Sequence, residues 1–468
     1  MTATSHPRLD VFKFGGTSLG SAERIAQAAQ LVQRQAAIGQ VVVVVSAMAG
    51  VTEDLIRAAA AASRHETELW QRLGERMHEK HLRTCRELLS GEELALAESA
   101  VATARATFTD FCSGFSLVNE VTPRSLDSLS SLGEVLAATI LAATLREAGL
   151  SAEAVDATQV IITDDHFGNA SPLLEPSRQR IADGLGPRLR DGITPVVTGF
   201  RAATDEGLCT TLGRGGSDYS ATILGALLPA DEIWIWTDVD GILTADPRLV
   251  ASAHVLPEVS YREAIELSFF GAKVIHSKSI ELPMRTGIPV WIKNSFRPEQ
   301  RGTRIANTAA GRPGVRAVAH TAEAHLFTVS GADGFPFTRL AAAVFNALEA
   351  ERVTTLIVTQ SSAENVICFA VASREAGRVQ RRLEKEHSLA GSPLLAIEVT
   401  PKVGIVVAVG EAMKGTPGIA ARLFGALGRR GINVRAISQG SSELSVSAAV
   451  QASDLPAAVG AIHEEFAL

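Results

Sequence analysis

Two glycine-rich turns, each between an apolar run and a helical pattern, hold the residues most suited to chemistry. The first, KFGGTS, contains Lys13, Gly15 and Gly16, with Thr17 and Ser18 as candidate helix caps. Glycines let the backbone approach a bulky group, and free N–H groups at a helix start attract anions. The lysine precedes the glycines and no GK[ST] follows, so this is not a P-loop. A phosphate site and a structural turn both fit the pattern.

The second turn, TTLGRGGSDYSA, also leads from a strand-like run into a helix. Arg214 carries a planar guanidinium suited to a carboxylate or a phosphate. Asp218 lies where the helix begins, so it could cap that helix or orient lysines. Two such turns could face one ligand.

Acidic residues follow a third strand pattern in WTDVDGILTADPR. Asp238, Asp240 and Asp246 lie where an open α/β sheet would hold a ribose hydroxyl or an ion, and Arg248 follows them. DVDG and ADPR are equally good turn sequences, so both interpretations stay open. In FFGAKVIHSKSI, Lys273 taken alone is typical of a surface lysine.

Continuous apolar runs predict the elements that must position these turns. The run Val41–Val45 is typical of a strand buried on both faces, and VFKF, TPVVTGF, EIWIWTDVDG and IPVWIKN have the same character. Helical patterns separate these runs, and residues 60–150 are mostly helical in pattern. The sequence therefore predicts an α/β fold with a mainly parallel sheet.

Length and charge exclude several classes. The 468 residues suggest about three domains, and the net charge of −7 gives no basic footprint for nucleic acid. The apolar runs Val41–Val45 and Leu132–Leu145 are shorter than the roughly 20 residues that span a bilayer, so we expect no membrane segment. Residues 1–10 lack an apolar signal core, which favours a cytoplasmic location.

Cysteine and histidine spacing predicts no metal site. The four cysteines are far apart and form no CxxC pair, so we expect reduced thiols. The segment HEKH, His78–His81, lies among charged residues and is expected on a solvated helix face.

The region after residue 294 changes in composition and then repeats. Residues 294–315 are rich in Gly, Pro, Arg and Asn and are expected to link domains. Beyond them, the segment from Leu340 aligns with the segment from Ile419, and each copy predicts an amphipathic helix followed by two strands. In the first copy, Leu340, Val344, Phe345 and Leu348 are expected on one helix face.

The order of KFGGTS, SLGE, TTLGRGGSDYSA, WTDVDGILTADPR and ELSFFGAKVIH resembles the aspartate kinases of the amino acid kinase family over essentially the whole chain. The resemblance implies a three-layer α/β sandwich at 8–305, followed by two α+β ACT (ferredoxin-like) domains at 316–398 and 399–468. In this arrangement the last strand of the second ACT domain could pair with the sheet of the first ACT domain.

The implied reaction transfers the γ-phosphoryl group of ATP to the β-carboxylate of L-aspartate, the first step of lysine, threonine and methionine biosynthesis. Implied catalytic residues are Lys13, Asp218 and Arg214, and implied aspartate-binding residues are Ser46, Thr52, Glu134, Arg214 and Ser217. Implied ATP-binding residues are Lys13, Gly15, Gly16, Thr237, Asp238, Asp246, Arg248 and Lys273. Mg²⁺ would be held mainly by phosphate oxygens and water rather than by a protein metal site. Leu243, where many relatives have tyrosine, and Ser277, where they often have proline, depart from the pattern.

The ACT-like repeat implies feedback inhibition. Gln360 and Gln439 occupy the same place in each copy, and in the family such glutamines favour threonine as the effector, with lysine as the alternative. A homodimer or homotetramer joined through the ACT domains is expected. The alternatives are another family member, such as acetylglutamate or glutamate kinase, and a non-catalytic ACT amino-acid sensor.

Overall fold

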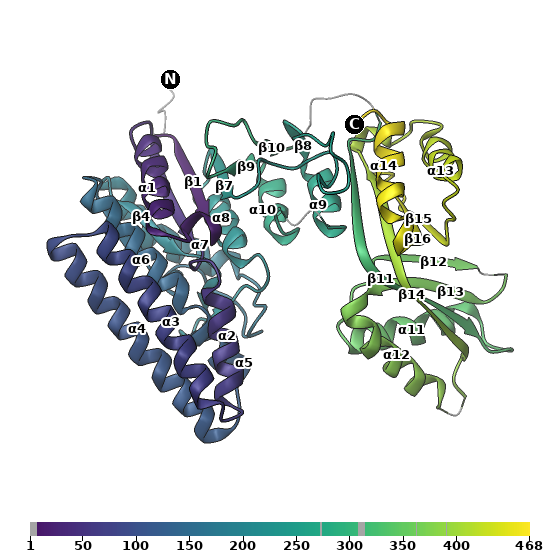
Figure 1. The fold of residues 1–468 in the computed structure, drawn as a ribbon, viewed down its shortest axis with the longest axis horizontal. Coiled ribbons are helices and arrows are strands. Elements are labelled where there is room, and N and C mark those ends of the chain that lie inside the picture. The colour runs from purple at the N-terminus through teal and green to yellow at the C-terminus, as the bar shows by residue number, and fades with distance from the viewer. Residues whose placement is uncertain (1–6, 272–273, 308–313, 362, 390) are drawn as a thin grey trace. The chain divides into compact units, whose positions relative to one another are not determined.

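The computed structural model describes residues 7–271, 274–307, 314–361, 363–389 and 391–468. The chain divides into two compact units (Figure 1). Unit 1 comprises residues 1–242, 257–261 and 274–309, and unit 2 comprises 243–256, 262–273 and 310–468.

An eight-stranded sheet forms the centre of unit 1, in the order β3-β4-β2-β1-β7-β9-β10-β8. All neighbouring strands are parallel except β9 and β10, which confirms the predicted mainly parallel α/β sheet. The strands are β1 (Leu9–Phe14), β2 (Gln40–Val45), β3 (Ala152–Val155), β4 (Thr194–Thr198), β7 (Glu232–Thr237), β8 (Glu258–Ser260), β9 (Val290–Asn294) and β10 (Thr303–Ala306). A separate hairpin pairs β5 (Arg201–Ala203) with β6 (Cys209–Thr211).

Helices cover both faces of this sheet, which is why β2 is a continuous valine run. The apolar core formed with α1 and α6 includes Val41, Val43 and Val45 of β2. Helix α8 also packs against β2, and it contacts the neighbouring strands β1 and β7. The helices of this unit are α1 (Ala22–Ala36), α2 (Val51–Ala62), α3 (Thr67–Leu88), α4 (Gly91–Val118), α5 (Pro123–Ser130), α6 (Leu132–Glu147), α7 (Leu174–Arg190), α8 (Gly216–Leu227) and α10 (Lys278–Thr286). Helix α9 (Tyr261–Phe269) begins in unit 1, but its remaining residues belong to unit 2.

The helices α2 to α6 confirm the helical character predicted for residues 60–150. By length and composition alone, the segment Pro123–Glu147 could cross a membrane, but 83% of its most apolar window is buried, as in the core helix of a soluble protein. The expectation of a solvated HEKH face is wrong for His81, which is fully buried on α3 and donates from Nδ1 to the Met77 carbonyl oxygen at 2.7 Å. Burial lowers the pKa of His81 to about 4, so its ring is neutral.

The expected linker at 294–315 is wrong in its first part. Asn294 ends β9, and residues 303–306 form β10, which pairs with both β9 and β8. A strand of four residues among Gly, Pro and Arg leaves little periodic signal, so the sequence did not reveal it.

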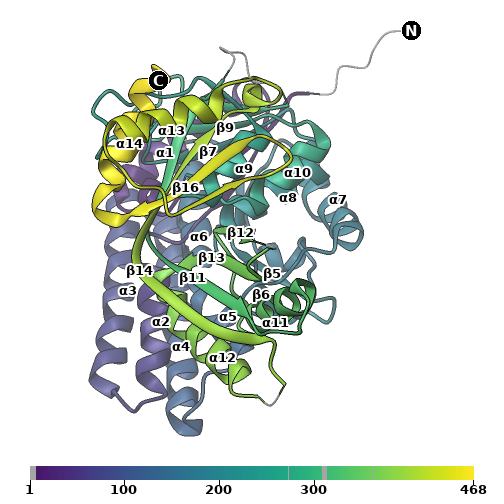
Figure 2. The same ribbon diagram turned by 90° about the vertical axis from the view of Figure 1, so that its right-hand side faces the viewer.

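Unit 2 contains an antiparallel six-stranded sheet in the order β12-β13-β11-β14-β16-β15. Its strands are β11 (Ala317–Gly331), β12 (Ile357–Ser361), β13 (Val366–Ala372), β14 (Leu394–Val409), β15 (Ala436–Gln439) and β16 (Ser445–Gln451), and its helices are α11 (Phe337–Ala350), α12 (Ser373–His387), α13 (Ile419–Arg429) and α14 (Leu455–Glu465). The predicted repeat of a helix followed by two strands is confirmed as α11-β12-β13 and α13-β15-β16. The long strands β11 and β14 run side by side through both halves (Figure 2).

Two apolar cores lie on this sheet, one for each copy of the repeat. Leu340, Val344 and Leu348 of α11 are buried in the first core as predicted, but Phe345 is 43% exposed. Val318 near the start of β11 belongs to the second core, and Leu394 at the start of β14 belongs to the first. The two copies therefore exchange strand segments.

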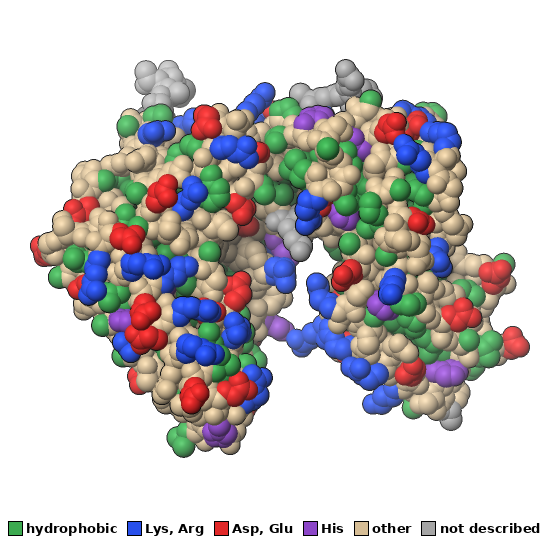
Figure 3. All heavy atoms as spheres, viewed as in Figure 1, with side chains coloured by type: hydrophobic (Ala, Val, Ile, Leu, Met, Phe, Trp, Pro, Cys, Tyr) green, Lys and Arg blue, Asp and Glu red, His purple; other side chains and the backbone are tan. Residues whose placement is uncertain are grey.

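Short 3-10 helices complete the described elements: η1 (Thr17–Leu19), η2 (Ala157–Gln159), η3 (Glu411–Met413) and η4 (Ala452–Asp454). Acidic and basic side chains are interspersed on the face of unit 1 seen in Figure 3, in keeping with the small net charge of −7.

Candidate active site

Lys13 pairs with Asp218 because of the two-residue period of β1. Phe12 and Phe14 point into the core shared with α1 and α6, so Lys13 points to the opposite face, where α8 packs. Its Nζ lies 2.6 Å from an Asp218 carboxylate oxygen, and the two side chains are 10% and 13% exposed. Asp218 belongs to the first turn of α8 and makes no capping hydrogen bond. The structure thus places Asp218 where it orients the lysine.

The first glycine turn packs tightly beside this ion pair. A Cβ on Gly15 would lie 3.6 Å from Lys13 Nζ, and one on Gly16 would lie 2.8 Å from the Ala47 carbonyl oxygen. The N–H of Gly15 donates to the Trp236 carbonyl oxygen at 3.0 Å, which ties the turn to the end of β7.

The predicted helix caps after this turn are wrong. Thr17 and Ser18 lie in η1, and Ser21 caps α1 by accepting from the Arg24 N–H. The Ser18 hydroxyl instead lies 2.7 Å from the Ser295 hydroxyl and joins the ends of β1 and β9.

Three segments of unit 1, which carry Ser46, Gly199 and Ser217, converge beside the first glycine turn. Ser46 follows β2, and its N–H donates to the Phe14 carbonyl oxygen at 3.0 Å. The Gly199 N–H donates to the Val45 carbonyl oxygen. A Cβ added to Gly199 would lie 2.6 Å from the Ser217 side chain, so Ser217 packs directly against this glycine. Thr52 lies in the first turn of α2, which follows the Ser46 loop.

Glu134 is a buried carboxylate with a free oxygen. It lies in the first turn of α6 and is 3% exposed, and the Ala47 N–H donates to it. Among the described residues its Oε2 has no hydrogen-bond partner. Burial raises the pKa of Glu134 to about 7. A cationic ligand group would satisfy both the free oxygen and the charge.

Arg214 is exposed on a turn that needs two left-handed glycines, Gly213 with φ 76° and Gly215 with φ 72°. A Cβ on Gly215 would lie 2.6 Å from the His276 side chain. The pKa of His276 is lowered mainly by burial and then by the charges of Lys278 and Arg214, while Asp218 opposes this. His276 therefore lies within reach of the charges of Arg214, Asp218 and Lys278.

Thr237 and Asp238 lie at the carboxyl end of β7, beside the first glycine turn. The Thr237 hydroxyl donates to the Asp238 carboxylate at 3.2 Å, and its carbonyl oxygen accepts from the Ser295 N–H at 2.8 Å. Asp238 is exposed. Asp240 accepts from the Asn294 side chain at 2.7 Å.

Asp246 and Arg248 belong to unit 2, where they form an ion pair of 2.6 Å. The hydrogen bond from Arg248 lowers the pKa of Asp246. Their loop is anchored within unit 2, because the Val318 N–H donates to the Thr244 carbonyl oxygen at 2.8 Å. Lys273 lies outside the described residues.

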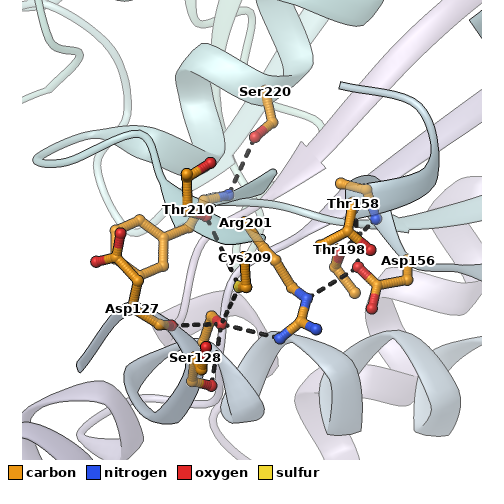
Figure 4. Close-up of polar contacts among 12 residues, drawn as sticks. Asp127, Ser128, Asp156, Thr158, Thr198, Arg201, Cys209, Thr210 and Ser220 are labelled. Atoms are coloured by element: carbon orange, nitrogen blue, oxygen red, sulfur yellow. Dashed lines mark hydrogen bonds and ion pairs between the residues drawn. The ribbon is translucent and has the colours of Figure 1, made fainter. Parts of the chain in front are cut away.

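Sequence reasoning missed several residues beside the site. Lys278 donates to the Asn169 side chain at 2.8 Å, next to the Arg214 turn. Phe200 has a left-handed backbone with φ 64°, and Arg201 follows it (Figure 4). The strand pattern TPVVTGF ends at these residues, and only its abrupt end at Gly199 and Phe200 could have drawn attention to them.

No group of three or more His, Cys, Asp or Glu side chains that could hold a metal ion occurs within the described ranges. The carboxylates near the first turn are either paired, like Asp218, or exposed, like Asp238.

Comparisons with known proteins show the family to which the chain belongs. The profile of the Amino acid kinase family matches residues 9–294, and that of the ACT domain matches residues 406–466. The chloroplastic bifunctional aspartokinase/homoserine dehydrogenase 1 of Arabidopsis thaliana is 35% identical over 98% of this chain and 51% of its own length. This chain therefore spans about half the length of such relatives.

Relatives named as aspartokinases alone are also similar. The chloroplastic aspartokinase 1 of A. thaliana is 31% identical over 97% of this chain and 80% of its own length. The crystal structure of E. coli aspartokinase III with aspartate and ADP has a TM-score of 0.85 and 27% identity, covering 98% of this chain and 100% of that one. Its lysine and aspartate complex has a TM-score of 0.78 and 28% identity, covering 97% and 99%. The chain belongs to the amino acid kinase family, as an aspartokinase with a C-terminal ACT region.

Proposed function

We propose that the chain transfers the γ-phosphoryl group of ATP to the β-carboxylate of L-aspartate, giving 4-phospho-L-aspartate. The Lys13–Asp218 ion pair carries this proposal, because it fixes a cation beside Gly15 in a glycine turn of the kind that lets a phosphate approach the backbone. The aspartokinase relatives, and the aspartate and ADP bound to E. coli aspartokinase III, support it.

The chemistry requires no general base, because a carboxylate with an ordinary pKa of about 3.9 is already ionised at neutral pH. The obstacle is repulsion between that carboxylate and the nucleotide phosphates. Lys13 and the Gly16 N–H would offset the negative charge on the transferred group. The Gly15 N–H, which the sequence also offered as a donor, is already engaged by the Trp236 carbonyl oxygen. Asp218 holds the Lys13 ammonium in place at 2.6 Å.

Aspartate itself would lie between Glu134 and Arg214. The free Oε2 of Glu134 suits the α-ammonium group, and the exposed guanidinium of Arg214 suits the α-carboxylate. Ser46, Thr52 and Ser217 would line the remaining walls. Thr237 and Asp238 at the end of β7 would bind the nucleotide, with Mg²⁺ held on its phosphates. The family resemblance also assigns nucleotide binding to Asp246, Arg248 and Lys273.

Feedback regulation would act through unit 2, which we divide into ACT domains at 316–398 and 399–468. Gln360 and Gln439 are both exposed, at the ends of the edge strands β12 and β15, and the Ser438 hydroxyl donates to the Val358 carbonyl oxygen at 3.3 Å. We propose threonine as the effector, with lysine as the alternative, and a cytoplasmic homodimer or homotetramer. Light scattering of the purified chain measures the assembly.

A hydroxamate assay with MgATP tests the catalytic proposal. L-aspartate should give product, while glutamate and N-acetylglutamate should not. Lys13→Met provides the matched negative control. Turnover with another acceptor would overturn the substrate assignment, and no turnover with any of them would favour a sensor.

A further inference from the structure

The Arg201 side chain connects three segments of unit 1. From β5 it donates through Nε to the Asp156 carboxylate at 2.9 Å and through Nη1 to the Ser131 hydroxyl at 3.0 Å. Figure 4 shows the guanidinium between Asp156 and Cys209. The side chain is only 17% exposed, so both bonds are shielded from water.

Ser131 transmits this contact to the start of α6. It ends α5 and precedes α6, it is fully buried, and its hydroxyl donates to the Asp127 carbonyl oxygen at 2.8 Å. The Asp127 carboxylate is fixed in turn by the N–H groups of Gly168 and Thr211. Glu134 follows Ser131 by three residues, so both lie on the same side of the first helical turn.

Opposing charges act on the Glu134 carboxylate from two elements packed around it. Arg201 on β5 lowers the pKa of Glu134, and Glu53 on α2 raises it, while burial has the largest effect. Asp156 neutralises part of the Arg201 charge. Since the pKa of Glu134 is about 7, a modest change in these charges alters how much of it is ionised at neutral pH.

We infer that Arg201 is a positioning residue for amino-acid substrate binding: through its hydrogen bond to Ser131 it fixes the junction between α5 and α6, where Glu134 lies in the first turn of α6. The inference rests on the proposed function, in which Glu134 binds the α-ammonium group of aspartate. Arg201 itself touches no reacting atom. Its contribution is to the affinity for aspartate rather than to phosphoryl transfer.

Arg201→Met and Arg201→Lys separate charge from geometry. In Arg201→Met, KM for aspartate should rise about tenfold. The value of kcat, measured at high pH with saturating aspartate, should stay within about threefold of that of the parent enzyme. The acid limb of kcat/KM for aspartate should move up by about one pH unit, because loss of the cation raises the Glu134 pKa. Arg201→Lys should return the acid limb of kcat/KM to its pH in the parent enzyme, but it should not restore the full affinity for aspartate.

Arg188→Met is the matched control, since Arg188 forms a similar partly buried ion pair with Glu153 at 2.7 Å in the same unit. It should change neither KM for aspartate nor the pH profile. If Arg201→Met does not fold, Ser131→Ala removes the junction bond while keeping the cation, and it should raise KM for aspartate with the acid limb unmoved. An unchanged KM in the folded Arg201 or Ser131 variant would overturn the inference.

A readout without turnover separates this inference from the proposed function. In protein labelled with ¹³Cδ-glutamate, the NMR titration of Glu134, assigned with Glu134→Gln, should shift up by about one unit in Arg201→Met. A shift in a chain that does not phosphorylate aspartate would refute the proposed function alone. An unmoved Glu134 titration would overturn the coupling to Arg201 even in an active enzyme.

Discussion

The Lys13 ammonium nitrogen lies 2.6 Å from an Asp218 carboxylate oxygen, joining the central strand β1 to the first turn of α8. Lys13→Ala should lower kcat by about 10² to 10³-fold, because the charge that meets the phosphate is lost. Asp218→Asn should cost less, since the lysine remains but is less well oriented. The hydroxamate assay measures both, with circular dichroism to show that each variant folds. Near-normal turnover in Lys13→Ala would remove it from this role.

Arg214→Ala should raise KM for aspartate about tenfold or more, because a charge-assisted pair to the α-carboxylate is lost. The exposed side chain contributes little to folding, so Tm should stay close to that of the parent. The control is Arg180→Ala, because Arg180 is an exposed residue of α7 that lies beside Asp205. This variant should leave KM for aspartate unchanged. Equal KM values in the two variants would contradict the assignment of Arg214.

The two glycines of the first turn should respond differently to alanine. Gly16→Ala places a methyl group 2.8 Å from the Ala47 carbonyl oxygen and should lower Tm. Gly15→Ala meets no atom closer than 3.5 Å, so it should fold normally, but its methyl group lies beside Lys13 Nζ and should raise KM for ATP. Calorimetry and initial rates distinguish these outcomes, and a reversed pattern would show that the turn does not receive a phosphate.

Glu134→Gln should weaken aspartate binding and stabilise the fold at high pH. The folded pKa of Glu134, about 7, lies above its ordinary value of 4.5, so the unfolded chain ionises first and native stability falls as pH rises between these values. The neutral glutamine removes this loss and should stabilise the fold by up to about 3 kcal/mol at pH 8, with little gain at pH 4. Urea unfolding at both pH values measures the difference, and KM for aspartate should rise steeply. An equal gain at both pH values would contradict the buried-charge explanation.

Gln360→Ala and Gln439→Ala should each weaken inhibition by threonine about tenfold or more, because each removes an amide that would hydrogen-bond the effector. Titration of threonine and lysine against activity measures this. Gln380→Ala, on the exposed face of α12, is the control and should leave inhibition unchanged. Insensitivity of the parent to both amino acids would leave unit 2 with a structural role only.

The sequence by itself determined the features that depend on local periodicity. Apolar runs predicted β1, β2, β4, β7 and β9, the repeat predicted two similar helix-strand-strand segments, and the glycine turns marked the ends of strands. These signals can be recognised in the sequence alone, because strand and helix periods are set by neighbouring residues along the chain.

Only the tertiary structure decided which chain-distant groups meet. It buried His81 and exposed Phe345, paired β10 with β9, and exchanged segments of β11 and β14 between the two copies of the repeat. It also placed Arg201 between Asp156 and Ser131, which no spacing in the sequence indicates. The physical reason is that burial, ion pairing and hydrogen bonding depend on which surfaces pack together, and that follows from the whole fold rather than from any single segment.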